Sequence, residues 1–136
     1  MLNSILLVDD NKATNFVHKK FIDKANCAKE VVSFQVGHKA IDYLKQLSTY
    51  PELIFIDINM PTMNAWEFIE KYNKLKPKGD QESKLILLTT ALSPFDHGKI
   101  KNYPIIQEVI LKPLDNLLIQ KIIEKYFEYE KVECEN

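Results

Sequence analysis

The chain has 136 residues, of which 46% are hydrophobic and 27% charged, the composition of one globular domain rather than of a disordered or collagen-like chain. Its 18 lysines nearly balance 19 acidic residues, and the net charge of −1 provides no positive field for nucleic acid. Arginine is absent, so only lysine and backbone groups are available to contact a phosphate.

The cysteines and the apolar runs exclude two further classes of protein. Cys27 and Cys134 lie far apart, with no other Cys or His at metal-ligand spacing, so no zinc site is expected. No stretch approaches the roughly 18 apolar residues of a membrane span, and no basic segment precedes the first apolar run. We therefore expect a cytoplasmic protein with reduced thiols and no contact with a membrane.

Five short apolar runs alternate with stretches whose apolar residues recur at helical spacing. The runs predict strands at 5–8, 30–36, 53–56, 84–89 and 109–111. The helical patterns predict helices at 11–22, 40–47, 65–72, 95–102 and 115–129. Polar residues predict an exposed loop at 76–83 and a frayed tail at 130–136. Two prolines and a glycine interrupt segment 93–107, so only a short helix fits there.

The alternation of strands and helices predicts a doubly wound α/β domain, in which helices cover both faces of a mostly parallel sheet. Ligands bind such a sheet outside the carboxyl ends of its strands, so the residues that follow each apolar run are the candidates for chemistry. These residues are Asp9, Asp10, Asp57, Thr89, Thr90 and Lys112.

Three carboxylates at one sheet edge repel one another unless a cation neutralises them, and oxygen ligands of this kind suit Mg²⁺. A lysine and a hydroxyl at the same edge complete a site for a phosphoryl group. Asp10 alone would indicate a helix cap and Lys112 alone a solvated surface, but neither explanation covers the whole set. No histidine follows a strand, so no general base is expected, and His18, His38 and His97 are predicted to be surface residues.

Four motifs in register resemble those of the receiver domains of two-component response regulators. They are Leu6–Asn11 (LLVDDN), Asp57–Met63 (DINMPTM), Thr90-Ala91 and Lys112-Pro113. The resemblance covers about residues 3–127 and leaves a short polar tail at 128–136. It implies a flavodoxin-like (βα)5 fold whose five-stranded parallel sheet has the strand order 2-1-3-4-5.

The resemblance also implies a role for each residue of the site. Asp57 would be the phosphoacceptor and would share the Mg²⁺ with Asp10, which binds it directly. Asp9 would assist through water, and the main-chain carbonyl of Asn59 would be a further ligand.

The phosphoryl group would be held by three other residues of the resembling motifs. Thr90 would be the switch hydroxyl, Ala91 would offer its backbone N–H, and Lys112 would contact the group with its ammonium. The Lys112-Pro113 peptide bond would be cis, which proline makes accessible.

The mechanism implied is in-line attack by Asp57 on a phosphoryl group carried by a histidine kinase or a histidine phosphotransfer protein. The chain would then be a phospho-accepting switch rather than an enzyme. Fewer than ten residues follow the last predicted helix, so we expect a stand-alone receiver that signals to an unidentified effector protein without binding DNA.

The sequence departs from the family pattern in three places. Val109 stands where an aromatic switch residue is common, which argues against the usual relay from threonine to aromatic ring. Ala65 stands where glycine is frequent, which suggests a different turn. The interrupted segment 93–107 lacks the usual Gly-Ala run, so its helix is expected to be short or mobile.

Two alternatives belong to other classes of protein. A Mg²⁺-dependent phosphatase or phosphotransferase on another α/β fold needs Asp-x-Asp after its first strand, whereas here Asp9 and Asp10 are adjacent and Asn11 follows. A flavodoxin-like or dinucleotide-binding module needs clustered glycines to hold phosphate, and the three glycines here are scattered.

Overall fold

The structure is a computed structural model and describes residues 1–75, 82–91 and 94–127. The strands are β1 (Leu2–Val8), β2 (Ala28–Phe34), β3 (Leu53–Asp57), β4 (Lys84–Thr89) and β5 (Ile106–Leu111). The helices are α1 (Lys12–Ala25), α2 (Gly37–Gln46), α3 (Ala65–Asn73), α4 (Pro94–Ile100) and α5 (Asn116–Tyr126). The predicted tail at 130–136 and most of the predicted loop at 76–83 lie outside the described residues.

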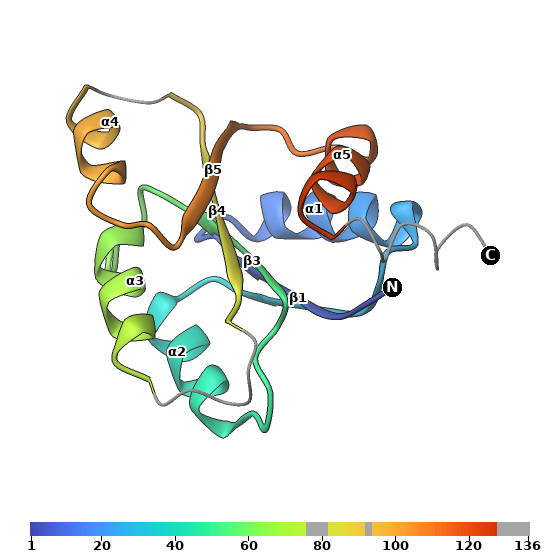
Figure 1. Cartoon of the computed structure of the whole chain (residues 1–136), viewed down its shortest axis with the longest axis horizontal. Helices are drawn as coiled ribbons and strands as arrows, with labels where there is room; N and C mark the ends of the chain where they lie inside the picture. Colours follow the sequence, from blue (N-terminus) through green and yellow to red (C-terminus); the bar gives the residue numbers. More distant parts are fainter. Residues whose placement is uncertain (76–81, 92–93, 128–136) are drawn as a thin grey trace.

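The strands form one parallel sheet in the order β2-β1-β3-β4-β5, which confirms the doubly wound fold and the strand order implied by the resemblance. Helices α1 and α5 lie together over one face of the sheet, and α2, α3 and α4 lie over the other (Figure 1). Within the described residues, no helix is long and apolar enough to cross a lipid bilayer.

The central strands are apolar on both sides because each face of the sheet carries its own core. Along β3, Ile54 and Ile56 pack toward α2 and α3, whereas Leu53 and Phe55 pack toward α1 and α5. All four side chains are buried. Asp57 ends the same strand, so its carboxylate sits on a rigid and fully packed element.

Polar side chains begin the helices that follow the candidate site residues. The Asn11 side chain accepts a hydrogen bond from the Thr14 N–H at the start of α1, directly after Asp9 and Asp10. Asn64 and Glu67 form a capping box at the start of α3, which ends the loop after Asp57. These caps fix where the two loops of the site stop and the helices begin.

The structure differs from the prediction at the two edges of the sheet and at the start of β1, which begins at Leu2 instead of residue 5 because the polar Asn3 and Ser4 interrupt its apolar residues. β5 begins at Ile106, before the predicted 109, and β2 spans 28–34 instead of 30–36. Edge strands expose one side to solvent and so carry polar residues such as Gln107, which interrupt the apolar runs. The register between β4 and β5 also shifts at Leu85 and Ile86.

The interrupted segment 93–107 does contain one short helix, as predicted. α4 begins at Pro94, where a residue without an N–H loses no helical hydrogen bond, and it ends at Ile100. After it, Tyr103 stacks on Trp66 of α3 with ring centroids 5.6 Å apart, so the chain that leads into β5 is attached to α3.

Candidate functional site

Three carboxylates meet at the carboxyl edge of the sheet. Asp9 and Asp10 follow β1, and Asp57 ends the neighbouring strand β3, whose Ile56 is paired with Val8. One carboxylate oxygen of each aspartate lies within 4.8 Å of the other two. Asp9 and Asp57 are buried, whereas Asp10 is exposed.

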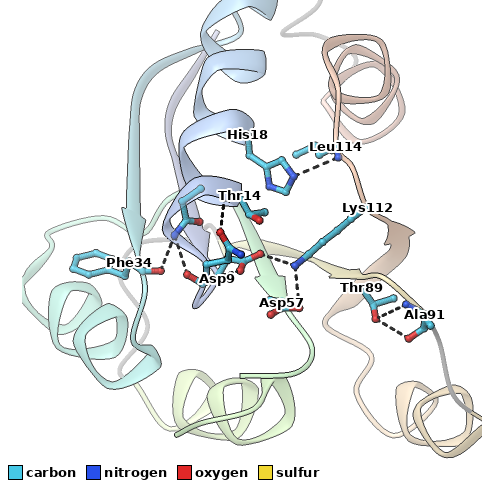
Figure 2. A network of polar contacts seen from close by, with 11 residues as sticks. Asp9, Thr14, His18, Phe34, Asp57, Thr89, Ala91, Lys112 and Leu114 are labelled. Atoms are coloured by element: carbon cyan, nitrogen blue, oxygen red, sulfur yellow. Dashed lines mark hydrogen bonds and ion pairs between the residues drawn. The ribbon is translucent and has the colours of Figure 1, made fainter. Parts of the chain in front are cut away.

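Lys112, which directly follows β5 on the far side of β4, completes this cluster. Its Nζ lies 2.7 Å from Asp9 Oδ2 and 3.3 Å from Asp57 Oδ1. Figure 2 shows the lysine side chain reaching across the strand ends to a position between the two carboxylates. One ammonium against three carboxylates leaves the site with a net negative charge.

The ionised form of Asp57 is unfavourable in this environment. The pKa of the Asp57 carboxyl is raised to about 6, chiefly by burial and then by the negative charge of Asp9, while Lys112 opposes both effects. Burial alone would lower the pKa of Lys112, but its hydrogen bond to Asp9 and the charges of both aspartates raise it above the usual value. The lysine is therefore charged at neutral pH and only partly relieves the crowded carboxylates.

The donor set fits a hard divalent cation such as Mg²⁺. Carboxylate oxygens are its preferred protein ligands, and the exposed Asp10 leaves room for the waters that Mg²⁺ retains. Asp9 is already engaged, because its Oδ1 accepts the Asn11 N–H at 2.9 Å and its Oδ2 pairs with Lys112. Asn59 lies exposed in the loop after β3, two residues past Asp57.

Two hydroxyls lie at this edge, those of Thr89 and Thr90. Thr89 ends β4 and is buried, and its Oγ1 donates to the Ala91 carbonyl at 2.7 Å and accepts the Ala91 N–H at 3.2 Å (Figure 2). Thr90, the predicted switch hydroxyl, lies one residue beyond the strand and is exposed. Two adjacent threonines end the apolar run, and the run alone does not distinguish them.

The turn after β5 is as the resemblance implied. The Lys112-Pro113 peptide bond is cis. The Lys112 N–H donates to the Thr89 carbonyl at 2.8 Å, so the lysine and the threonine are joined through the backbone. Val109, in place of an aromatic residue, is paired with Leu87 and only partly buried.

Two polar residues of α1 lie beside the site although the sequence did not predict them there. His18, predicted at the surface, is buried, and its Nε2 accepts the Leu114 N–H at 3.4 Å. Asn15 is also buried and donates to the carbonyls of Asp9 at 2.9 Å and Phe34 at 3.4 Å. Both side chains share a helical stripe with the buried Ile22, and that spacing was the signal that could have identified them.

The other two histidines are exposed, as predicted. Burial lowers the pKa of His18, the charge of Asp9 raises it, and the charge of Lys112 lowers it, with a net decrease. The imidazole of His18 is therefore neutral at physiological pH, which agrees with its role as a hydrogen-bond acceptor.

Comparison with known proteins supports the assignment of the fold. The response regulator receiver domain family matches residues 5–126. The chain is 30% identical over 129 residues to hybrid signal transduction histidine kinase L of Dictyostelium discoideum, covering 93% of this chain and 7% of that protein. It is 34% identical over 73 residues to protein-glutamate methylesterase/protein-glutamine glutaminase 3 of Burkholderia thailandensis, covering 54% of this chain and 20% of that protein. The chain thus spans a small part of either relative.

Solved structures agree with the family match. A two component response regulator from Cytophaga hutchinsonii superimposes with a TM-score of 0.80 at 28% identity, covering 93% of this chain and 98% of that one. The receiver domain of a sensor histidine kinase from Pseudomonas aeruginosa PAO1 superimposes with a TM-score of 0.76 at 17% identity, covering 93% and 98%. The latter is described with a magnesium ion coordinated in its active site cleft. The fold, the clustered aspartates and these matches show that the chain belongs to the response regulator receiver domain family.

Proposed function

We propose that this receiver domain accepts one phosphoryl group on Asp57 from a phosphohistidine and passes the resulting change of surface to a partner protein. The observation that carries the proposal is the meeting of Asp9, Asp10 and Asp57 with Lys112 at the carboxyl edge of the sheet. Asp57 is the carboxylate that ends a central strand, and its raised pKa marks it as the group most in need of a counter-charge.

In the proposed reaction, a carboxylate oxygen of Asp57 forms a bond to phosphorus while the bond from phosphorus to the donor's imidazole nitrogen breaks. The electron pair of that bond stays on the nitrogen, and the product is an acyl phosphate. The Lys112 ammonium, 3.3 Å from Asp57 Oδ1, is placed to stabilise negative charge on the transferring oxygens. Water later hydrolyses the acyl phosphate, so the signal is transient.

We assign the metal-binding role to Asp9, Asp10, Asp57 and the main-chain carbonyl of Asn59. Asp10 is exposed, which supports a direct contact, whereas both Asp9 oxygens already have partners, which supports a contact through water. When bound, Mg²⁺ would neutralise charge on the transferring oxygens and on the crowded carboxylates. The neighbour described with magnesium in its active site cleft supports the same choice of ion.

The role of switch hydroxyl is proposed for Thr90, which is exposed directly after β4 and precedes Ala91. Its neighbour Thr89 is buried, and the Thr89 hydroxyl and the Ala91 main chain bind each other. A phosphoryl group on Asp57 would offer the Thr90 hydroxyl and the Ala91 N–H a stronger, charged acceptor. The Ala91 N–H would then exchange its hydrogen bond to Thr89 for one to a phosphoryl oxygen, and the backbone from residue 90 onward would follow.

The phosphodonor is proposed to be a histidine kinase or a histidine phosphotransfer protein. The relative named as a hybrid signal transduction histidine kinase supports this class of donor. The output is proposed to be a protein that distinguishes the two states of the surface around α4 and β5, where the Thr89 loop leads.

Intact-mass measurement after incubation with acetyl phosphate and Mg²⁺ tests the proposal. The wild type should gain the mass of one phosphoryl group, and Asp57→Asn, which lacks the nucleophilic carboxylate, should gain none. Asp23→Asn is the matched control, because Asp23 is an exposed aspartate in the last turn of α1, at the opposite end of that helix from the cluster, and it should be labelled like the wild type. Undiminished labelling of Asp57→Asn, or labelling that survives EDTA, would contradict the proposed site.

A further inference from the structure

His18 is a buried imidazole that the proposed reaction does not use. It lies in α1 with 2% of its surface exposed, and it points toward the turn between β5 and α5 (Figure 2). Its Nε2 accepts the Leu114 N–H at 3.4 Å, across 96 residues of sequence. Leu114 is itself fully buried and stands two residues after Lys112.

The Lys112–Leu114 turn has two main-chain donors, and each has a partner on a different element. The Lys112 N–H donates to the Thr89 carbonyl of β4 at 2.8 Å. Pro113 has no N–H, and the Leu114 N–H donates to His18 of α1. The turn is therefore held from the sheet by a carbonyl and from the helix by an imidazole.

The position of this turn sets the position of the Lys112 ammonium. That ammonium must reach Asp9 at 2.7 Å and Asp57 at 3.3 Å from a strand that is not adjacent to either. A long, flexible lysine side chain keeps such contacts only if its backbone stays in place, since misplacement of about 1 Å can cost a large factor in rate.

We infer that His18 is a positioning residue for phosphoryl transfer, which holds the Lys112–Leu114 turn through Nε2 and so keeps the Lys112 ammonium between Asp9 and Asp57. This inference rests on the proposed function, because it names a second layer of the same site. The acceptor nitrogen must carry no proton, so the imidazole is the neutral tautomer with its proton on Nδ1. Burial and the Lys112 charge both favour that neutral form, while Asp9 opposes it.

The rival explanation is that the imidazole only fills space between α1 and the turn. Two substitutions separate these roles. His18→Phe keeps a ring of similar size but removes the acceptor, whereas His18→Gln places an amide oxygen near the position of Nε2 and keeps an acceptor. Ile22→Val is the matched control, because Ile22 is buried on the same stripe of α1 but has an apolar side chain.

The experiment measures initial rates of phosphorylation by acetyl phosphate with Mg²⁺, in the wild-type background and in Lys112→Ala. His18→Phe should lower the rate at saturating donor by about tenfold, and His18→Gln and Ile22→Val should stay within about threefold of wild type. In the Lys112→Ala background, His18→Phe should have no further effect, because the group that it positions is gone. Equal losses in both backgrounds, or a wild-type rate for His18→Phe, would overturn the inference.

A second measurement uses the wild-type protein and so does not depend on whether a variant folds. Nitrogen-15 NMR of the imidazole near neutral pH should show His18 neutral, with its proton on Nδ1. A charged ring, or a proton on Nε2, would overturn the inference. A wild type that takes up no phosphoryl group would instead refute the proposed function, and the two failures are distinguishable.

Discussion

The carboxylate of Asp57 is unfavourable in the folded protein when it is ionised without a divalent cation. Its pKa is raised to about 6 from an ordinary value of 3.8, chiefly by burial and then by the charge of Asp9. Because the folded state holds this proton to a higher pH than the unfolded state, the free energy of unfolding decreases as pH rises from the lower value to the higher one. Above about pH 6, ionisation of Asp57 causes no further decrease in the free energy of unfolding.

Asp57→Asn should therefore stabilise the Mg²⁺-free protein at neutral pH. The expected gain in the free energy of unfolding is about 1–2 kcal/mol, after allowance for solvent screening. Urea denaturation in EDTA measures it, and the gain should shrink when the pH is lowered toward about 4.5, where Asp57 is protonated in the folded wild type. A gain of the same size at both pH values would show that ionisation of Asp57 is not its cause.

Lys112 has two effects that point in opposite directions. Its ammonium stabilises the transferring oxygens, but it also occupies the two carboxylates that a divalent cation needs. Lys112→Ala should lower the rate of phosphorylation by about 100-fold and yet strengthen Mg²⁺ binding by roughly threefold to tenfold, because a competing positive charge is removed.

Isothermal titration calorimetry of Mg²⁺ binding tests the second effect of Lys112. Lys125→Ala is the matched control, since Lys125 is exposed and pairs with Glu108 on a different part of β5 at 3.6 Å. Its Mg²⁺ affinity should equal that of the wild type. An unchanged or weaker affinity in Lys112→Ala would mean that the lysine does not compete with the ion.

The central strands β3 and β4 were predictable because burial on both faces makes their sequences almost continuously apolar. The first three residues of β1 were not predicted, because Asn3 and Ser4 interrupt its apolar residues. The bounds of β4 agree with the predicted 84–89, and β3 differs only by Asp57, a polar residue at the strand end. The edge strands β2 and β5 were less predictable, since one side of each meets solvent and the apolar run is broken.

Within the site, the sequence correctly predicted the charged residues that stand at the carboxyl ends of the strands. The sequence placed Asp9, Asp10, Asp57 and Lys112 together, and the structure brings them together. It assigned the switch hydroxyl to Thr90, which stays a prediction, and it did not indicate that the adjacent Thr89 hydroxyl is buried against Ala91. It also missed His18, because the partner of that imidazole is a backbone N–H 96 residues away.

The α4 region is where the phosphoryl signal should leave the site. Val109 has a small side chain with a restricted χ1 angle, so it cannot switch between inward and outward positions as an aromatic ring does. The signal is therefore not expected to pass through a side-chain rotation on β5. The backbone after Thr89 remains, and beyond α4 it is already attached to α3 through Tyr103, which stacks on Trp66 and donates to Glu70 at 3.2 Å. The change should therefore be concentrated between Ala91 and that attachment.

Amide hydrogen exchange with and without beryllium fluoride and Mg²⁺ tests this route. Protection should increase over residues 91–107, most strongly before Tyr103, because the Thr90 hydroxyl and the Ala91 N–H would acquire a fixed anionic partner. Asp57→Asn should show no such increase. Protection gained only in β5 and α5, with 91–107 unchanged, would refute the route through this segment.

At the scale of the whole molecule, the carboxylates that make the site reactive also lower the free energy of unfolding of the Mg²⁺-free protein. Mg²⁺ relieves this repulsion, so it should raise the free energy of unfolding by about 1.4 kcal/mol when its concentration is roughly ten times its dissociation constant. The melting temperature should rise accordingly. Asp10→Asn should lose most of this dependence and remain folded. Thermal melts with Mg²⁺ and with EDTA measure both, and a wild-type melting temperature indifferent to millimolar Mg²⁺ would argue against a metal site.

The central claim is that Asp57 carries the phosphoryl group as an acyl phosphate, and borohydride trapping tests it most directly. Borohydride reduces an aspartyl phosphate to homoserine, and peptide mass spectrometry then locates the modified residue. After phosphorylation with Mg²⁺, homoserine should replace Asp57 in the peptide that contains residues 53–63, and it should be absent when EDTA is present. Homoserine at another aspartate, or a phosphoryl group that resists borohydride on a histidine or lysine, would contradict the claim.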